Sequence, residues 1–190
     1  MEFMEKSGAF IKQCRGFSGN LYDLRINYCV NTIKYKISAE ITDPKMKDDG
    51  FYTFGNELRD TYCDGYFTTN EEDGSASFNI SVGERMEKRG IGTFLLDTAF
   101  FCIIQYNKMH KVKINRLSGE LSIYDEQRGF WKRSIPFYHS YPDRMDKHIL
   151  SEICSVTPQF KIRKTGEIVA AQEMLQQKEN GYIVFLIQYK

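Results

Sequence analysis

The stretch from Ser75 to Lys111, SASFNISVGERMEKRGIGTFLLDTAFFCIIQYNKMHK, decides how the rest of the chain is interpreted. It begins with an alternating strand that ends at Val82, and a charged turn then leads to Gly90–Gly92. The apolar run from Phe94 to Ile104 is long enough for a buried helix. A glycine turn at a helix start presents backbone N–H groups that have no partner inside the helix, and the peptide dipoles add positive partial charge there. This place is therefore suited to binding a phosphate group.

The overall composition is that of an ordinary globular protein. The chain has 190 residues, enough for one domain with a sizeable core, of which 42% are hydrophobic and 27% are charged. The net charge is +1, from 26 basic and 25 acidic residues, so no basic excess indicates nucleic acid or an anionic membrane as a partner. No apolar stretch approaches the ~20 residues of a membrane span, and residues 1–16 lack the apolar core of a signal peptide. We therefore expect neither nucleic acid nor a membrane as a partner.

The cysteines and histidines are scattered along the sequence. No two cysteines form a CxxC pair, and their number is odd, which favours free thiols in a reducing cytoplasm. The three histidines lie far apart and near no cysteine pair, so the sequence predicts no metal site. The cysteines are Cys14, Cys29, Cys63, Cys102 and Cys154, and the histidines are His110, His139 and His148.

The first half of the chain is typical of an antiparallel meander. Ile33 to Ile41 alternates apolar and polar residues, as a strand with one solvent-facing side does. Asp60 to Thr68 is rich in Tyr and Phe, and Ala76 to Val82 alternates again. The segment before these strands is harder to interpret, and we expect a short helix over Ala9–Cys14.

The second half has a helical character. Thr93–His110 is apolar nearly all round, so this helix should be covered on most sides. Lys111–Leu117 alternates as a strand, and a strand–helix–strand unit of this length predicts a right-handed crossover with two parallel strands. The remaining expected elements are helices at 123–133, 143–154 and 167–178, a short strand at 136–141 and a final strand at 182–189.

Two common phosphate loops are excluded by spacing. The dinucleotide-binding fingerprint needs a third glycine at the position that Leu95 occupies. The nucleoside-triphosphate loop needs Gly, four residues and then Gly-Lys-Ser/Thr, whereas Lys88 here is followed by Arg89. Both loops also usually follow an early parallel strand, and this turn follows a meander.

The run from Ile80 to Leu96 resembles the acyl-CoA signature of the GNAT N-acetyltransferases. That signature is a strand ending in valine, about four residues, and then Gln/Arg-x-x-Gly-x-Gly/Ala at the start of a helix. Val82 ends the strand here, and Gly90 and Gly92 occupy the two small positions in register. Glu87 stands where the family has Gln or Arg, which places an acid close to the expected diphosphate.

A second, weaker resemblance lies downstream. The segment Phe130–Phe137 is similar to the family's Phe-Tyr-x-Lys-x-Gly-Phe segment with one extra residue, and Trp131 stands at the tyrosine position. The resemblance as a whole covers roughly Ile33 to Phe137. It implies an α+β fold: a mixed, mostly antiparallel central sheet with a strand–loop–helix–strand parallel crossover and helices on both faces. It also implies a single domain over 1–190, with a core at about 30–140 and a C-terminal extension at about 143–190.

The resemblance implies acetyl-CoA as the cofactor. In such a fold the strand before the loop splays from its parallel neighbour, and the gap accepts the pantetheine arm. Two groups of backbone atoms would bind the coenzyme. The pantetheine amides would bond Ile80, Ser81 and Val82, and the diphosphate would bond the N–H groups of Lys88, Arg89, Gly90, Ile91, Gly92 and Thr93.

The chemistry that the resemblance implies is attack of a primary amine on the thioester. The reaction needs a base to take the amine proton and an acid to protonate the leaving thiolate. Because the indole of Trp131 is no useful acid, Tyr124 and Tyr138 are the substitutes nearby. For the base we expect Glu120 or Glu84. The acceptor is an amine of a small molecule or of a protein, and the sequence identifies it no further.

Two other functions stay open at this point. The first is a non-catalytic relative that keeps coenzyme binding or serves as a partner-binding module, because Glu87 and Trp131 replace two functional family positions. The second is a different mixed α/β binding protein in which the glycine turn is only structural. Exposed strand edges would also permit a homodimer.

Overall fold

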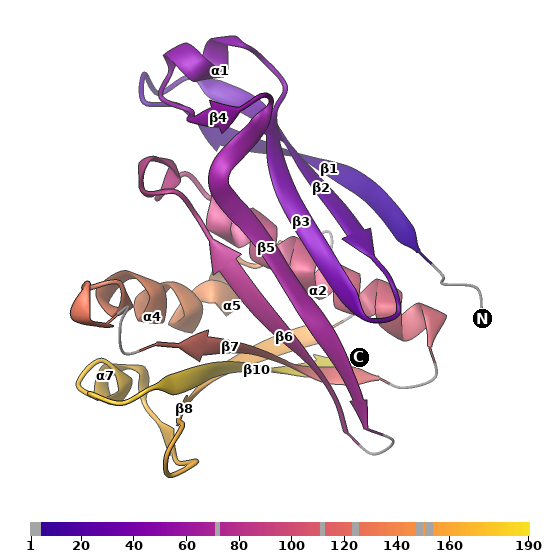
Figure 1. Ribbon diagram of the computed structural model, residues 1–190, viewed down its shortest axis with the longest axis vertical. Coiled ribbons are helices and arrows are strands. Elements are labelled where there is room, and N and C mark those ends of the chain that lie inside the picture. Colours follow the sequence, from indigo (N-terminus) through magenta and orange to yellow (C-terminus); the bar gives the residue numbers. More distant parts are fainter. Residues whose placement is uncertain (1–4, 71–72, 111–112, 123–125, 147–149, 151–153) are drawn as a thin grey trace. The chain divides into compact units, whose positions relative to one another are not determined.

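The computed structural model describes residues 5–70, 73–110, 113–122, 126–146, 150 and 154–190. It is rich in strands, with 46% strand and 27% helix. The strands are β1 (Lys6–Arg15), β2 (Leu21–Val30), β3 (Lys34–Ile41), β4 (Thr53–Phe54), β5 (Glu57–Asn70), β6 (Asp73–Ser81), β7 (Ile114–Leu121), β8 (Cys154–Ile162), β9 (Ile168–Val169) and β10 (Gly181–Tyr189). They form one mixed sheet in the order β1-β2-β3-β5-β6-β7-β10-β8-β9, and β4 pairs with β5 (Figure 1).

Helices make up the smaller part of the structure. Within the described residues there are five helices and one short 3₁₀ turn, η1, and no helix there is long and apolar enough to cross a membrane. The helices are α1 (Lys45–Asp48), α2 (Ile91–Met109), α4 (Trp131–His139), α5 (Tyr141–Arg144) and α7 (Ala171–Met174), and η1 is Glu84–Met86.

The fold predicted from the sequence is wrong in its architecture. We expected an α+β fold with helices on both faces of the central sheet, whereas the chain forms a strand-dominated, ten-stranded mixed sheet with five helices in the described part. The physical reason is visible in the burial pattern of β8, where Cys154, Val156, Phe160 and Ile162 are buried between more exposed neighbours. This period of two suits a strand and not the amphipathic helix that the prediction extended to Cys154.

The chain divides into two compact units. One comprises residues 1–66 and 79–111, and the other comprises residues 67–78 and 112–190. Strands β5 and β6 run through both.

The first unit is built on antiparallel strands covered by α2. β1 and β2 pair over ten residues, from Lys6 opposite Val30 to Arg15 opposite Leu21, so the helix expected at Ala9–Cys14 is wrong. β2 pairs with β3 and β3 with β5, both antiparallel, which confirms the predicted meander.

Helix α2 packs against the β1–β2 hairpin. The ring of Phe101 lies 4.9 Å from the ring of Phe10 and 5.2 Å from the ring of Tyr28, centroid to centroid. Most of the helix is buried, and its polar Thr98 side chain donates a hydrogen bond to the Phe94 carbonyl at 2.7 Å. The helix predicted from the apolar run is therefore confirmed, and its burial fixes the position of the turn that precedes it.

The second unit contains the parallel strand pair. β6 pairs with β7 in parallel from Gly74 to Phe78, as predicted. β10 lies between β7 and β8 and is antiparallel to both, which confirms the predicted final strand. The core of this unit is aromatic, because Tyr138 of α4 and Tyr141 of α5 both contact the ring of Phe185 on β10.

Three further expectations in this unit fail or are only partly testable. The strand expected at 136–141 is helical, and Pro136 lies inside α4. The helix expected at 167–178 is the short strand β9 followed by the four-residue helix α7. The helix expected at 123–133 is confirmed in part: Glu126 and Gln127 are helical, residues 128–130 form a turn, and α4 starts at Trp131. Of the helix expected at 143–154, residues 143–144 and 150 are helical, whereas Cys154 begins β8. Residues 123–125, 147–149 and 151–153 lie outside the described residues.

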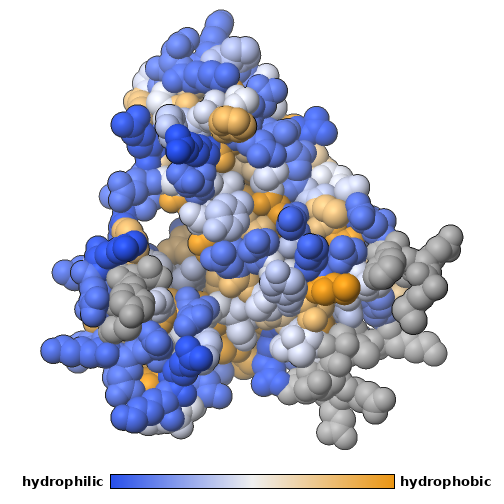
Figure 2. Space-filling view, in the orientation of Figure 1, coloured by the Kyte–Doolittle hydropathy of each residue, from blue (hydrophilic) through white to orange (hydrophobic). Residues whose placement is uncertain are grey.

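The face of the molecule shown in Figure 2 is mainly hydrophilic. Large hydrophobic side chains reach the surface at separate positions of the described chain, with Phe54 the most exposed at 84%. Isolated apolar residues of this kind are normal on soluble domains.

Candidate functional site

The turn before α2 leaves its backbone donors open. Gly90 is the N-cap residue, with φ 83° and ψ −7°, and no described side chain caps the helix. The first helical hydrogen bond runs from the Phe94 N–H to the Gly90 carbonyl at 3.1 Å. Among the described residues, no acceptor bonds the N–H groups of Ile91, Gly92 or Thr93. These donors point out of the first turn of a 19-residue helix, where an anion is favoured.

Glycine is required at position 90. Its φ of 83° lies in the left-handed region, which costs an L-residue about 1–2 kcal/mol. A Cβ at this position would also lie 3.3 Å from Cζ of Phe94. Lys88, two residues earlier, also has a positive φ, of 61°, and its side chain is exposed. The turn is therefore tightly wound, and the Lys88 charge faces solvent beside it.

Arg89 has a different role from the one that its place in the turn indicates. Its guanidinium carbon lies 4.0 Å from the ring centroid of Phe17 and 4.5 Å from that of Phe51. Both terminal nitrogens are buried and have no hydrogen-bond partner in the part of the chain that the structure describes. Burial lowers the pKa of Arg89, and the nearby Cys14 and Asp49 oppose this shift. The side chain is thus packed between two aromatic rings, and only its backbone N–H remains available to a ligand at the turn.

Asp49, the residue after α1, holds the β1–β2 turn that carries Phe17, one of the two rings packed on Arg89. The Ser18 N–H donates to Oδ1 of Asp49 at 2.6 Å, and the Ser18 hydroxyl donates to Oδ2. These bonds, led by the one from the Ser18 hydroxyl, lower the pKa of the Asp49 carboxyl. The Phe17 N–H also donates to the Asp49 carbonyl at 3.3 Å. The β1–β2 turn, the end of α1 and the turn before α2 therefore form one connected structure.

The end of β6 is anchored to a distorted part of β5. The Ser81 hydroxyl donates to the Asp60 carbonyl at 2.9 Å, and the Gly83 N–H donates to the Thr61 hydroxyl at 3.2 Å. Asp60 has a positive φ of 54°, and the register of β5 with β3 shifts beside it. Ile80, Ser81 and Val82, the predicted pantetheine residues, are half-buried, and the parallel ladder of β6 with β7 ends at Phe78.

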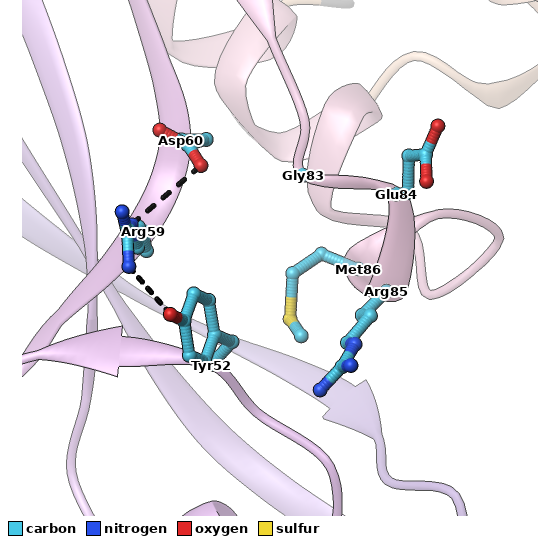
Figure 3. A pocket seen from close by; sticks show the side chains of 7 residues that line it. All are labelled: Tyr52, Arg59, Asp60, Gly83, Glu84, Arg85 and Met86. Carbon is cyan, nitrogen blue, oxygen red and sulfur yellow. Dashed lines mark hydrogen bonds and ion pairs between the residues drawn. The ribbon is translucent and has the colours of Figure 1, made fainter.

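A cavity of about 330 Å³ lies beside this anchor in the first unit. Its lining comes from the segment before β4, from β5 and from η1 (Figure 3). We call it the arginine pocket. The residues that line it are Tyr52, Arg59, Asp60, Gly83, Glu84, Arg85 and Met86.

Sequence reasoning missed the arginine pocket because its charged residues come from separate elements with no shared spacing. Glu84, one of the two predicted bases, lines the pocket, but its carboxylate points away from Tyr52 (Figure 3). A pair of arginines on a bulged strand and on a 3₁₀ turn leaves no motif in the sequence. Only the pairing of β5, with its shifted register, brings them to one place.

The other predicted catalytic residues lie in the second unit. Glu120 forms an ion pair with Arg163 at 3.2 Å, and both side chains are more than half exposed. Tyr138 is 8% exposed and its ring contacts the rings of Phe78, Phe137 and Phe185. Tyr124 lies outside the described residues.

Trp131 is a buried residue of the second unit. It is 2% exposed, and its indole nitrogen has no hydrogen-bond partner among the described residues. The predicted coenzyme residues, by contrast, all belong to the first unit. The predicted phosphate site is therefore contained in one compact unit.

The sequence matches no protein-family model, and no curated protein matches it.

Proposed function

We propose that this chain binds acetyl-CoA at the turn before α2 and transfers the acetyl group to a primary amine of a small molecule or a protein. The observation that carries the proposal is the set of open N–H groups at Ile91, Gly92 and Thr93, with no capping side chain. A side chain that capped this turn would occupy the donors that a coenzyme diphosphate needs.

The residues present fit the diphosphate of a coenzyme. The N–H groups from Lys88 to Thr93 supply donors, and Gly90 and Gly92 add no Cβ atoms to the turn. The exposed ammonium of Lys88 adds charge, while Glu87 opposes it. A hydrogen bond to a charged group contributes about 1.5–3 kcal/mol net, so three to five of them account for the roughly 8 kcal/mol of a micromolar complex.

The half-buried strand end offers a place for the pantetheine arm. The backbone of Ile80, Ser81 and Val82 follows the last paired residue of the parallel ladder, Phe78. When bound, the coenzyme supplies an activated thioester, and the chain orients it and handles protons. The residues predicted from the sequence for the two proton transfers, Glu120 as the base and Tyr138 as the acid, belong to the second unit, and their roles stay predictions.

A second candidate function is acetyl-CoA binding without catalysis. Two observations favour it. The Glu120 carboxylate is engaged by Arg163 at 3.2 Å, and the Tyr138 ring is buried in an aromatic cluster. Both groups would have to leave these contacts to act on a substrate. A non-catalytic sensor or partner-binding module needs only the coenzyme-binding turn and neither of these two side chains.

Gly92→Glu tests the coenzyme site. The substitution places a carboxylate at the second residue of α2, where it repels a diphosphate but suits the helix dipole, so the fold should tolerate it. We expect calorimetry to show micromolar acetyl-CoA binding by the wild type and at least tenfold weaker binding by Gly92→Glu. Gln172→Glu adds the same charge at an exposed position of α7 in the second unit and should bind like the wild type. Equal affinity in all three proteins would remove the proposed site.

The release of free thiol from acetyl-CoA separates the two candidate functions. Turnover with any member of a panel of primary amines would support the transferase. Tight binding with no thiol release across small amines and lysine peptides would instead support the non-catalytic module. We also propose a reducing, cytoplasmic location, which all five cysteines support because they are free thiols.

A further inference from the structure

The arginine pocket carries two guanidinium groups around a single aromatic ring. The guanidinium carbon of Arg59 lies 5.1 Å from the ring centroid of Tyr52, and that of Arg85 lies 5.9 Å from the same point. Figure 3 shows the Tyr52 ring between the two arginines, with the Met86 side chain reaching toward it. Two positive charges therefore border the pocket, one on either side of this ring.

The two arginines differ in how they are engaged. A terminal nitrogen of Arg59 donates to the Tyr52 hydroxyl, and its Nε lies 3.8 Å from Oδ2 of Asp60. Arg85 makes no hydrogen bond or ion pair with any described residue. Since the Glu84 carboxylate points away from the ring, Asp60 is the acid that competes for the pocket (Figure 3). The Arg85 guanidinium is the open donor.

The backbone around the pocket is held in an uncommon conformation. Asp60 has a φ of 54°, and its carbonyl accepts the Ser81 hydroxyl. Gly83 is tied to Thr61 through its N–H. A non-glycine residue with positive φ inside a strand costs free energy, and such strain gathers at binding sites. These ties fix β5 and η1 on two sides of the cavity.

The chemistry of the lining selects a phosphate ester with an apolar or aromatic part. A phosphomonoester carries nearly two negative charges and three acceptor oxygens, and the planar fork of arginine matches that geometry. The Tyr52 ring, 46% exposed, and the Met86 side chain supply an apolar wall. A cavity of about 330 Å³ is at the small end of ligand-binding pockets.

We propose that the arginine pocket binds a phosphomonoester attached to an aromatic group, with Arg85 and Arg59 on the phosphate and Tyr52 beside the ring. This ligand chemistry has two sources. One is the 3′-phosphoadenosine end of the coenzyme, in which case the inference rests on the proposed function. The other is a separate mononucleotide.

The pocket is tested with adenosine 3′-monophosphate in a ligand-observed NMR titration. The wild type should bind this probe, and unphosphorylated adenosine should bind at least tenfold more weakly. Arg85→Gln and Arg59→Gln should each weaken binding about tenfold, the loss expected for one charge-assisted hydrogen bond. Arg25→Gln removes the same charge from an exposed position of β2 in the same unit and should leave binding unchanged.

Asp60→Asn gives a test of opposite sign. Asparagine tolerates positive φ, so the backbone is kept while the competing carboxylate is removed. Binding of adenosine 3′-monophosphate should tighten about threefold or more because one repulsive charge is lost. No binding by the wild type, or equal binding by the wild type and both arginine variants, would overturn the proposal.

A comparison of coenzyme A with dephospho-coenzyme A distinguishes the two sources. If the pocket holds the end of the coenzyme, the wild type binds coenzyme A about tenfold more tightly, and Arg85→Gln removes this difference. If the pocket holds a separate nucleotide, the two coenzymes bind equally while adenosine 3′-monophosphate still binds. Binding of the monophosphate by a protein that binds neither coenzyme would support the pocket and refute the proposed function.

Discussion

Alanine at Gly90 and alanine at Gly92 should change stability in opposite directions, although the two positions are neighbours in one turn. Gly90 has φ 83°, where an L-residue costs about 1–2 kcal/mol. The new Cβ would also lie 3.3 Å from Cζ of Phe94, so that ring must shift by a few tenths of an ångström. We therefore expect Gly90→Ala to lower the free energy of unfolding by about 1–2 kcal/mol.

Gly92 is the second residue of α2 and has a helical backbone. Alanine is favoured over glycine by about 0.5–1 kcal/mol inside a helix, because glycine loses more backbone freedom on folding. Gly92→Ala should therefore raise the free energy of unfolding by up to that amount. The two variants should differ by about 1.5–3 kcal/mol.

Urea unfolding followed by circular dichroism measures this difference from the shift in midpoint at a constant m value. Gly55→Ala is the control, because Gly55 also has a positive φ, of 60°, but a Cβ there meets nothing within 4 Å. It should reproduce the backbone cost of Gly90→Ala without the contact to Phe94. If Gly90→Ala proved neutral while Gly55→Ala destabilised, Gly90 would not be left-handed, and the arrangement of open amides derived from it would be wrong.

Two other groups give direct tests. The pKa of Asp49 is lowered in the fold, chiefly by the hydrogen bond from the Ser18 hydroxyl. The contribution of the ionised Asp49 carboxylate to stability is therefore present above the unfolded pKa of about 3.9, and it is lost as pH falls through the lower folded pKa. Asp49→Asn should therefore destabilise at pH 7 and much less at pH 2–3, as urea midpoints at the two pH values would show; equal losses would refute the role of the charge. Burial raises the pKa of Cys14 to about 11 and also raises the pKa of the buried Cys63 and Cys102, so mass spectrometry after iodoacetamide treatment at pH 8 should find these thiols unlabelled in the native protein and labelled in urea. Fast native labelling of Cys63 would contradict its place in the core.

The features that local patterns encode were predictable from the sequence. Glycine spacing and an unbroken apolar run located the turn and α2, since both signals lie within Gly90–Ile104. The alternation of Ala76 to Val82 located β6, and the length of the intervening helix predicted the parallel pairing with β7. Each of these depends on residues close together in the sequence.

The features that depend on distant partners were not predictable. β1 is an edge strand with little burial, so its residues do not alternate clearly enough to exclude a helix. The packing of Arg89 between Phe17 and Phe51 depends on the β1–β2 turn and on the segment after α1, both far from Arg89 in the sequence. The arginine pocket depends on the shifted register of β5, which no local pattern records.

The packing of Arg89 has a consequence for how this turn would be recognised in other proteins. Its guanidinium is sandwiched by a phenylalanine more than seventy positions upstream, and that ring is positioned by hydrogen bonds from Ser18 and Phe17 to Asp49. A contiguous motif around Gly90 therefore captures only half of what shapes the loop. Substitutions in the β1–β2 turn will therefore change the surroundings of Gly90 and Gly92 without changing the two glycines themselves.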